Sequence, residues 1–318
     1  MNAIISTELF LLIAQKISGR SIKSQLMPSN SSFIFFGGEP LGLPCLKALV
    51  AAGLVPKLVI CNPDRPSGRG QQLQTSPLKV WATEQNIPVF QPTTYKVKED
   101  LTPLFANEWD LFVVVAYNFI LPKWLLDLPK HGVINVHPSL LPKLRGASPI
   151  RTAILEHLRD AVGVSIMLMD EKMDHGPILA QAPVVIPDAK WPIDGPALDA
   201  LLAEKGGDML AATIPQWLNG LITPREQEHV AATYTKKFEK SDSELFINPI
   251  NLPTGDEAFS TLLKIKAFAG MFDTFFMDNG KRIKIKDATL GEDGSLRILR
   301  VVPEGRKEMD FTAYLSAR

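Results

Sequence analysis

The stretch Asn135-Val136-His137-Pro138-Ser139-Leu140-Leu141-Pro142 places an amide and an imidazole two residues apart, just before a stiff apolar turn. Residues i and i+2 of a β-strand point to the same face, so Asn135 and His137 can converge on one small atom, such as a carbonyl oxygen. An amide donor beside a proton carrier is what acyl or one-carbon transfer requires. A lone histidine at a strand end is more often structural, so the rest of the chain has to decide.

Short apolar strands alternate with helical stretches on both sides of this segment. Residues 111–116 are a continuous apolar run, which is typical of a central parallel strand buried on both faces, and residues 133–136 are a second such strand, interrupted only by Asn135. The alternation predicts a doubly wound, mostly parallel, Rossmann-like α/β sheet. Ligands of such sheets bind at the carboxyl ends of the strands, where Gly37, Tyr117 and His137 are expected. Further strands are expected at 33–36, 58–61, 88–90, 163–168 and 178–186, the last at a sheet edge because Pro183 interrupts it. Helices are expected at 43–52, 77–85, 149–159 and 198–218.

The composition is that of an ordinary globular protein, with 318 residues, 46% of them hydrophobic and 21% charged, enough for two domains. The formal net charge of zero excludes a global field that attracts polyanions, so a nucleic acid would need a local basic patch. Cys45 and Cys61 lie in apolar segments without metal-ligand or disulfide spacing. They are expected to be core residues of a cytoplasmic protein that holds no metal. No apolar run reaches membrane-spanning length, so no membrane partner is expected.

Residues 1–32 are expected to form an N-terminal extension outside the fold. Residues 1–26, with Lys16, Arg20 and Lys23, have the pattern of a short amphipathic helix or a transit peptide. The alternative is that translation starts at Met27. A secretory signal is disfavoured because Glu8 precedes the apolar run and no small-residue cleavage site clearly follows it.

Composition divides the remaining chain into a catalytic domain at 33–222, a polar linker at 223–242 and a C-terminal domain at 243–318. In the last, short runs alternate apolar and charged residues and are separated by turns at 278–280 and 293–294, which predicts a small antiparallel sheet. Its basic residues form either a nucleic-acid surface or an ordinary solvated face. They are Lys281, Arg282, Lys284, Lys286, Arg297 and Arg300.

A carboxylate that could orient His137 is expected from residues 170–177. This loop leaves the strand that ends near Met169, and a further strand end would bring the loop to the same rim as His137. A carboxylate beside an imidazole favours its charged form and fixes its orientation. Asp170, Glu171 and Asp174 are all candidates, and the residue pattern alone does not choose among them.

Three other segments have both a functional and a structural interpretation. Residues 63–70 carry Arg65 and Arg69 between prolines and glycines, which suits phosphate contact but also an ordinary surface loop. Arg145 suits a phosphate or carboxylate ligand, or a structural ion pair. Residues 117–122 can clamp a flat heterocycle, or pack in the core.

Together these segments resemble the folate-dependent formyltransferase family. The resemblance rests on 135–142 with 145–150, on 116–122 and on 169–176, and it extends from about Phe33 to the C-terminus. The loop 63–70, running on to 76–80, narrows it to the methionyl-tRNA formyltransferases. Two departures concern the second domain, which is short between 288 and 296 and has no Trp-Pro pair near 267–270.

The resemblance implies a catalytic trio of Asn135, His137 and Asp174, and it selects Asp174 over Asp170. It implies transfer of a formyl group from 10-formyltetrahydrofolate to the amino group of methionyl-initiator tRNA, for translation initiation. It also implies a monomer with an oligonucleotide-binding (OB-like) C-terminal domain. The expected folate-binding residues are Ser139, Leu140, Leu141, Pro142, Phe119, Ile120, Leu121, Met169 and Asp170, and the expected tRNA-binding residues are Arg65, Arg69 and Arg145.

Three alternatives remain open from the sequence. The same trio could formylate another amine, such as an amino sugar nucleotide or glycinamide ribonucleotide, although the arginine loop and the basic second domain argue against that. A hydrolase of the formyl donor would share the trio. A non-catalytic folate- or RNA-binding protein is disfavoured because the trio is intact.

Overall fold

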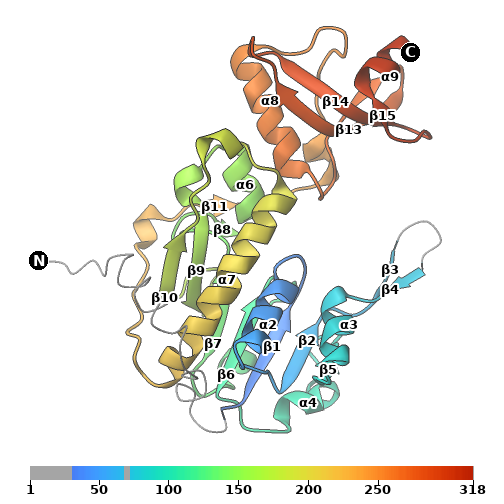
Figure 1. Ribbon diagram of the computed structural model, residues 1–318. Coiled ribbons are helices and arrows are strands. Elements are labelled where there is room, and N and C mark those ends of the chain that lie inside the picture. The colour runs from blue at the N-terminus through green and yellow to red at the C-terminus, as the bar shows by residue number, and fades with distance from the viewer. Residues whose placement is uncertain (1–30, 68–71, 318) are drawn as a thin grey trace, which may run out of the picture.

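The computed structural model describes residues 31–67 and 72–317, and its larger part is a seven-stranded sheet (Figure 1). The strand order is β10-β9-β7-β6-β1-β2-β5, and the five strands from β7 to β5 run parallel. This confirms the predicted mostly parallel α/β fold. The expectations for residues 1–26, for a start at Met27 and for Arg69 lie outside the described residues. The strands are β1 (Phe33–Gly37), β2 (Leu58–Cys61), β5 (Val89–Phe90), β6 (Leu111–Val115), β7 (Val133–His137), β9 (Gly163–Leu168) and β10 (Ile178–Pro183).

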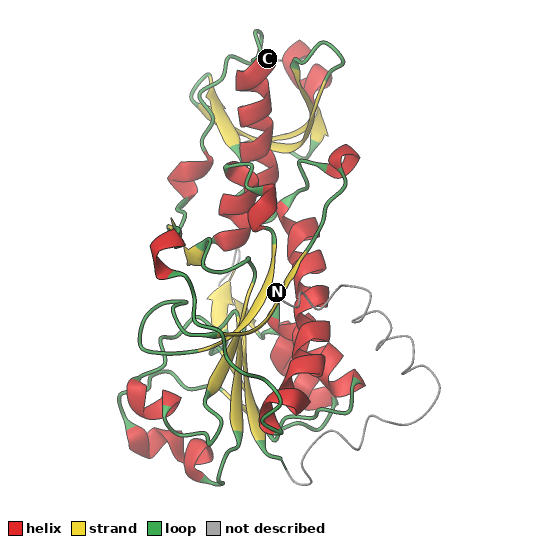
Figure 2. Ribbon diagram, turned by 90° about the vertical axis from the view of Figure 1, so that its left-hand side faces the viewer, coloured by secondary structure: helices red, strands yellow, loops and turns green. Residues whose placement is uncertain are grey.

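Helices cover both faces of the sheet (Figure 2), which is why β1 and β6 are apolar at every position. In β1, Phe33 and Phe35 pack into one buried cluster with residues of α2, α3, α6 and α7. Ile34 and Phe36 point the other way, into a second cluster that includes residues of α4 and α5. Alternate side chains of a strand therefore supply two separate cores. The helices are α2 (Gly42–Ala51), α3 (Pro77–Glu84), α4 (Thr102–Phe105), α5 (Lys123–Leu126), α6 (Pro149–Leu155) and α7 (Gly195–Leu218).

Two adjacent glycines allow α7 to lie close to the centre of the sheet. A Cβ atom on Gly207 would lie 2.6 Å from the Cβ of Ala48 in α2, and one on Gly206 would lie 2.9 Å from Cγ1 of Val136 in β7. Protein interiors are close-packed, so larger residues here would force these elements apart. The glycines thus help to fix β7, the strand that carries Asn135 and His137.

β9 does not end at the rim of the sheet where His137 lies, although the sequence predicted that it would, because it runs in the opposite direction to β7. β9 pairs antiparallel with β7, so Leu168 at the end of β9 lies opposite Ile134 near the start of β7. The end of β9 therefore lies away from the rim where His137 sits. β10 pairs antiparallel with β9 and occupies the edge of the sheet, as Pro183 predicted.

The segment expected as a loop between residues 62 and 74 contains a small antiparallel ribbon. It is formed by β3 (Arg65–Ser67) and β4 (Gln72–Gln74), with Arg65 opposite Gln74. The base of the ribbon is held by Asp64, which accepts hydrogen bonds from Lys79 Nζ at 2.6 Å and from Gln91 Nε2 at 2.9 Å. These contacts hold the pKa of Asp64 below its usual value, with the Lys79 hydrogen bond contributing most.

The C-terminal part is a four-stranded antiparallel sheet in the order β12-β13-β14-β15, with a core of its own. Tight turns connect the strands as predicted, with Asn279 and Gly280 both at positive φ between β12 and β13. The predicted β-rich domain is confirmed, and β12 and β15 form the two edges of its sheet. Its elements are α8 (Gly255–Phe268), β12 (Phe275–Asp278), β13 (Lys281–Leu290), β14 (Leu296–Pro303), β15 (Met309–Asp310) and α9 (Phe311–Ser316).

The polar segment 223–242 passes back over the larger sheet instead of only bridging two domains. Within it, β11 (Tyr234–Thr235) pairs in parallel with β8 (Arg145–Gly146). Gly146 has a φ of +111°, and a Cβ atom there would lie 2.7 Å from the carbonyl oxygen of Thr235, so only glycine fits. Short 3-10 helices occupy Lys98–Leu101, Arg159–Ala161, Asp188–Lys190, His229–Ala231 and Lys240–Ser243.

Cys45 and Cys61 are buried and unpaired, which confirms them as core residues. Burial raises the pKa of the Cys45 thiol to about 12 and that of the Cys61 thiol to about 11. Across residues 31–67 and 72–317, no helix combines the length and apolar character needed to cross a membrane.

Candidate active site

Asn135 and His137 lie on the same face of β7, as the strand period predicts. His137 is buried, whereas Asn135 is half-buried. Within the described part of the chain, the Asn135 amide has no hydrogen-bond partner, although its main chain is fixed between β6 and β9. Its amide group is therefore available to a bound molecule, on a strand that cannot easily shift.

A backbone carbonyl fixes the orientation of the His137 ring. Nε2 of His137 lies 2.9 Å from the carbonyl oxygen of Leu144. A carbonyl oxygen only accepts hydrogen bonds, so Nε2 carries a hydrogen whether or not the ring is charged. Nδ1 is then the nitrogen that can exchange a proton. Leu144 has a φ of +60°, and its N–H donates to Thr233 Oγ1 at 2.9 Å, which holds the carbonyl in place.

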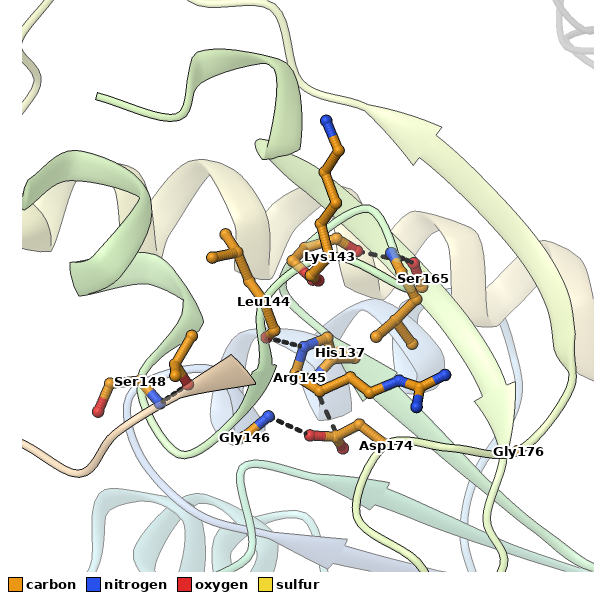
Figure 3. A network of polar contacts seen from close by, with 12 residues as sticks. His137, Lys143, Leu144, Arg145, Gly146, Ser148, Ser165, Asp174 and Gly176 are labelled. Carbon is orange, nitrogen blue, oxygen red and sulfur yellow. Dashed lines mark hydrogen bonds and ion pairs between the residues drawn. The ribbon is translucent and has the colours of Figure 1, made fainter. Parts of the chain in front are cut away.

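Asp174 is the carboxylate that meets this imidazole (Figure 3). Its Oδ1 lies 3.6 Å from Nδ1 of His137, and its Oδ2 accepts a hydrogen bond from the backbone N–H of Gly146 at 2.7 Å. The two rivals have other partners. Asp170 lies 2.6 Å from Nδ1 of His175, and Glu171 lies 3.6 Å from the Lys123 ammonium group. Among the three carboxylates, only Asp174 contacts His137.

The path by which Asp174 reaches His137 differs from the expected one. The backbone N–H of Met169 donates to the carbonyl of Val133, so the loop begins near the amino end of β7. The loop then folds back until Asp174 lies beside His137, with Asp174 at a φ of +51°. This left-handed conformation is uncommon for a residue other than glycine, and surrounding contacts must hold it.

Arg145 is not placed to bind tRNA directly. It is only 1% exposed, so a phosphate outside the protein cannot reach its guanidinium. Nε and Nη2 donate to Gln227 Oε1 at 3.1 and 2.7 Å, Nη2 also lies 2.9 Å from His229 Nδ1, and Nη1 lies 3.3 Å from the Tyr234 hydroxyl. Arg145 is therefore a structural residue, but Gln227 takes the place of the acid expected as its partner, and its burial argues against the predicted tRNA contact.

Sequence analysis missed the residues that support this site from the segment 223–242. Gln227 and Tyr234 contact the Arg145 side chain. Thr233 accepts a hydrogen bond from the N–H of Leu144 through its hydroxyl oxygen and one from the N–H of Arg145 through its carbonyl oxygen. The segment has no hydrophobic period because its only strand is two residues long, so the pattern resembled a linker. The available signal was the pair of threonines Thr233 and Thr235, whose hydroxyl oxygens accept from the backbone N–H groups of Leu144 and Ser148.

The turn 139–142 is held mainly by buried contacts. Ser139 is fully buried, and its hydroxyl donates to the carbonyl of Lys143 at 2.6 Å. Leu141 packs against Met167 and Ile178, and Pro142 is half-buried. Leu140 lines a cavity of about 400 Å³ that Asn135, His137 and Asp174 do not line. The main chain of the turn is also held within the protein, because Ser165 Oγ bonds both the Ser139 carbonyl and the Leu141 N–H, and Gln181 Nε2 donates to the Leu141 carbonyl. The turn is therefore a rigid surface whose main-chain groups already have partners.

Three of the other predicted folate-contact residues, Phe119, Leu121 and Met169, belong to the second core or pack against it. Tyr117, Phe119 and Met169 pack at the edge of the second core, although they come from segments about fifty residues apart. Ile120 is 87% exposed and Leu121 is buried beside them. The structure therefore brings the segments 117–122 and 169–170 together, with Ile120 as the exposed apolar side chain.

The predicted basic face of the C-terminal sheet is largely neutralised by neighbouring carboxylates. Asp273 lies 3.0 Å from Lys286 and 3.8 Å from Lys284, and Arg300 pairs with both Glu308 and Asp310. Arg297 lies 3.8 Å from Asp293, while the guanidinium of Arg282 lies 4.3 Å from the centre of the Phe275 ring. In the part of the chain that the structure describes, Lys281 has no carboxylate partner.

The fold and the residues on β7 define a formyltransferase-type domain, and comparison with known proteins supports this class. The sequence profile described as formyl transferase matches residues 44–190. The chain is 35% identical over 302 residues to the methionyl-tRNA formyltransferase of Thermodesulfovibrio yellowstonii, spanning 91% of this chain and 96% of that one. The corresponding protein of Methylococcus capsulatus is 36% identical over 89% of this chain and 96% of its own. The chain belongs to the methionyl-tRNA formyltransferase family.

Solved structures show the same fold at lower sequence identity. A 4-N formyltransferase from Francisella tularensis superposes with a TM-score of 0.59 at 20% identity, over 79% of this chain and 95% of that one. HypX from Aquifex aeolicus in complex with tetrahydrofolic acid gives a TM-score of 0.60 at 12% identity, over 90% of this chain and 47% of that one. These likenesses support the architecture alone.

Proposed function

We propose that this protein transfers the formyl group of 10-formyltetrahydrofolate to the amino group of methionyl-initiator tRNA, for translation initiation. The observation that carries the proposal is the convergence of a free Asn135 amide, the oriented His137 ring and the Asp174 carboxylate at one end of β7. Relatives that carry this name match about nine tenths of the chain, which favours tRNA over a sugar as the acceptor.

The proposed reaction begins when the uncharged methionyl amine attacks the formyl carbon. A bond forms between that nitrogen and carbon, and negative charge develops on the formyl oxygen. Asn135 donates a hydrogen bond to this oxygen, and protonated His137 donates a second from Nδ1, because Nε2 is already bonded to Leu144. The bond from the formyl carbon to N10 of the folate then breaks, which releases tetrahydrofolate and formyl-methionyl-tRNA.

In this mechanism Asp174 stabilises the imidazolium and helps to pass on the amine proton. The distance of 3.6 Å between Oδ1 and Nδ1 is longer than a direct hydrogen bond. A water molecule or the substrate amine can therefore share this space. We propose that the proton leaves the amine by this route and is passed to N10 of the folate, which takes up one proton as its bond to the formyl carbon breaks.

We place the folate beside the exposed surface formed by Phe119, Ile120 and Met169, with Asp170 at its margin. The main chain of the turn 139–142 forms the adjoining wall, where Ser139 and Leu141 act by holding the turn, and Leu121 supports Phe119 from the core. Leu140 packs against the separate cavity, so we assign it a supporting role.

We assign the tRNA contacts to Arg65 and Arg69 and to the C-terminal sheet. Arg65 lies on the ribbon strand β3, whose base Lys79 and Gln91 hold through Asp64. We further propose a catalytic domain at 33–222, a C-terminal tRNA-binding domain at 243–318, and a monomeric protein that acts in the cytoplasm.

One assay separates this function from its alternatives. The protein is incubated with 10-formyltetrahydrofolate and, in parallel, with methionyl-initiator tRNA, uncharged initiator tRNA or an amino sugar nucleotide. Formyl-methionyl-tRNA as the main product supports the proposal. Tetrahydrofolate release that is equally fast with uncharged tRNA would identify a hydrolase, and formylation of the sugar alone would identify a sugar-modifying enzyme.

A further inference from the structure

Gln227, in the segment 223–242, joins two parts of the protein that hold the catalytic residues: the buried Arg145 side chain and the loop that carries Asp174. It is only 4% exposed, and its side-chain amide makes four hydrogen bonds. Oε1 accepts from Nε and Nη2 of Arg145 at 3.1 and 2.7 Å, and Nε2 donates to the carbonyl oxygens of Asp174 and Gly176 at 2.9 and 2.7 Å. Arginine can only donate and a carbonyl can only accept, so these partners leave one possible orientation of the amide.

The first half of this bridge is Arg145. Its neighbour Leu144 supplies the carbonyl that orients His137, and its other neighbour Gly146 supplies the N–H that binds Asp174. Among the described residues, the buried guanidinium of Arg145 has no carboxylate partner, so Gln227 supplies the acceptor for two of its donors. Figure 3 shows the Arg145 side chain extending from β8 toward the Gly176 segment.

The second half of the bridge is the loop that carries Asp174. Asp174 has a left-handed backbone, with a φ of +51°, which residues other than glycine rarely adopt, so external contacts must hold it. The two bonds from Gln227 Nε2 fix the carbonyl groups on either side of His175, immediately after Asp174. They thereby determine where the Asp174 carboxylate lies relative to His137.

We propose that Gln227 is a positioning residue for formyl transfer, which sets the separation of Asp174 from His137 by joining Arg145 to the Asp174 loop. Among the described residues, its side chain bonds to the backbone of Asp174 but not to the Asp174 carboxylate or the His137 ring. The inference rests on the proposed function, because its main readout is formyl transfer. A residue that controls catalytic geometry in this way should affect turnover more than substrate binding.

The test compares Gln227→Glu with Gln227→Leu in the full-length protein. Glutamate keeps the oxygen that accepts both hydrogen bonds from Arg145 and adds a counter-charge, but it places a second acceptor oxygen against the carbonyl oxygens of Asp174 and Gly176. We expect Gln227→Glu to remain folded, with kcat lowered about 10- to 100-fold, KM for methionyl-tRNA and folate changed little, and an altered kcat–pH profile. Gln227→Leu loses both halves of the bridge, so its melting temperature should fall as well.

Gln216→Glu is the matched control, because Gln216 is an exposed residue of α7 whose side chain, among the described residues, bonds only to the carbonyl of Ala212. It should leave kcat, KM and the pH profile unchanged. A folded Gln227→Glu variant with wild-type kcat and pH profile would overturn the inference, as would a crystal structure of that variant with the Asp174–His137 separation unchanged. Wild-type protein that formylates no methionyl-tRNA would instead contradict the proposed function, and the crystal structure would still test the geometry.

Discussion

Asn135 offers the most direct chemical test at the scale of a single residue, because its amide has no hydrogen-bond partner in the described part of the protein. Removing one donor to an oxyanion typically raises the barrier by about 3–4 kcal/mol. We therefore expect Asn135→Ala to lower kcat about 10²- to 10³-fold, while the Kd for the folate changes little. Single-turnover rates and a folate titration would measure the two quantities, and an unchanged kcat would contradict the oxyanion role.

His229 is a second residue with a specific consequence, this time for stability. Its ring stacks on His175 with the ring centres 4.0 Å apart, and it lies 2.9 Å from Arg145 Nη2. Loss of hydration lowers the pKa of His229 from 6.5, and the neighbouring His175 ring and the positive charges of Arg145 and Lys172 lower it further, while Glu226 opposes them. The folded protein therefore favours neutral His229, and the unfolded chain takes up the proton first as the pH falls.

This difference predicts that the His229 contribution to stability is present above pH 6.5 and is lost as the pH falls below it. His229→Gln keeps an acceptor for Arg145 but does not titrate, so its melting temperature should depend less on pH between 7.5 and 5.5. Thermal melts of both proteins across this range would show the effect as a difference in slope. Equal slopes would indicate that His229 is not linked to folding.

At the scale of elements, the sequence predicted the strands whose environment leaves a clear pattern. β6 is buried along its whole length and is a continuous apolar run, β7 is apolar apart from Asn135 and His137, and Pro183 correctly marked β10 as an edge strand. The direction of β9 was not predictable, because a buried strand is equally apolar in parallel and antiparallel pairs. β11 has two residues and no period, so its place beside the site depended on tertiary contacts.

The same reasoning explains what could be predicted of the candidate site. Asn135 and His137 follow from the strand period, whereas the choice of Asp174 required either a family resemblance or the structure. The sequence left open whether Arg145 binds a ligand or has a structural role, because arginines are rarely buried and nothing near it in the sequence supplies its acceptor. Its burial depends on Gln227, which is 82 residues away in the sequence.

A buried ion pair joins α6 to α7, and its loss is predicted to lower the free energy of unfolding substantially. Arg151 donates to both carboxylate oxygens of Asp199, at 2.6 and 2.7 Å, and both side chains are buried. Removing one partner leaves the other charge uncompensated, so Asp199→Ala should lower the free energy of unfolding by about 3–5 kcal/mol. Chemical denaturation of the purified variant would measure the loss.

Asp188→Ala is the matched control for that pair. Asp188 also binds an arginine at 2.6 Å, Arg159, but its side chain is 92% exposed. Exposed ion pairs contribute about 0–1 kcal/mol, so this variant should be close to wild type. A similar loss in both variants would show that burial does not determine the strength of the Arg151–Asp199 pair.

At the scale of the whole molecule, the C-terminal part packs on the α/β part through α6 and α8 (Figure 1). His157, just after α6, contacts Phe259 of α8 with the ring centres 5.3 Å apart, and it also accepts a hydrogen bond from Trp191 Nε1. The segment 223–242 connects the two parts and also supports the catalytic residues through Gln227 and Thr233. The chain that leads to the proposed tRNA-binding domain is therefore part of the active-site structure.

The proposed tRNA contacts differ in how much charge they can offer to phosphate. Arg300 is paired with two carboxylates, so an RNA phosphate would have to replace these partners, whereas Lys281 is exposed and has no carboxylate partner among the described residues. Each phosphate contact with a free cation contributes about 0.9 to the slope of log K against log salt on duplex nucleic acid. The number of free cations at the interface, not the number of basic residues, should then set the salt dependence.

We therefore expect Lys281→Ala, Arg65→Ala and Arg69→Ala each to weaken methionyl-tRNA binding and to reduce the salt slope by up to about 0.9. Arg300→Ala should have a smaller effect, because its charge is already compensated within the protein. Filter-binding or fluorescence titrations at several salt concentrations would give the slopes. A reduction for Arg300→Ala as large as that for Lys281→Ala would mean that the intramolecular ion pairs open when tRNA binds, and would place the RNA across β14 and β15.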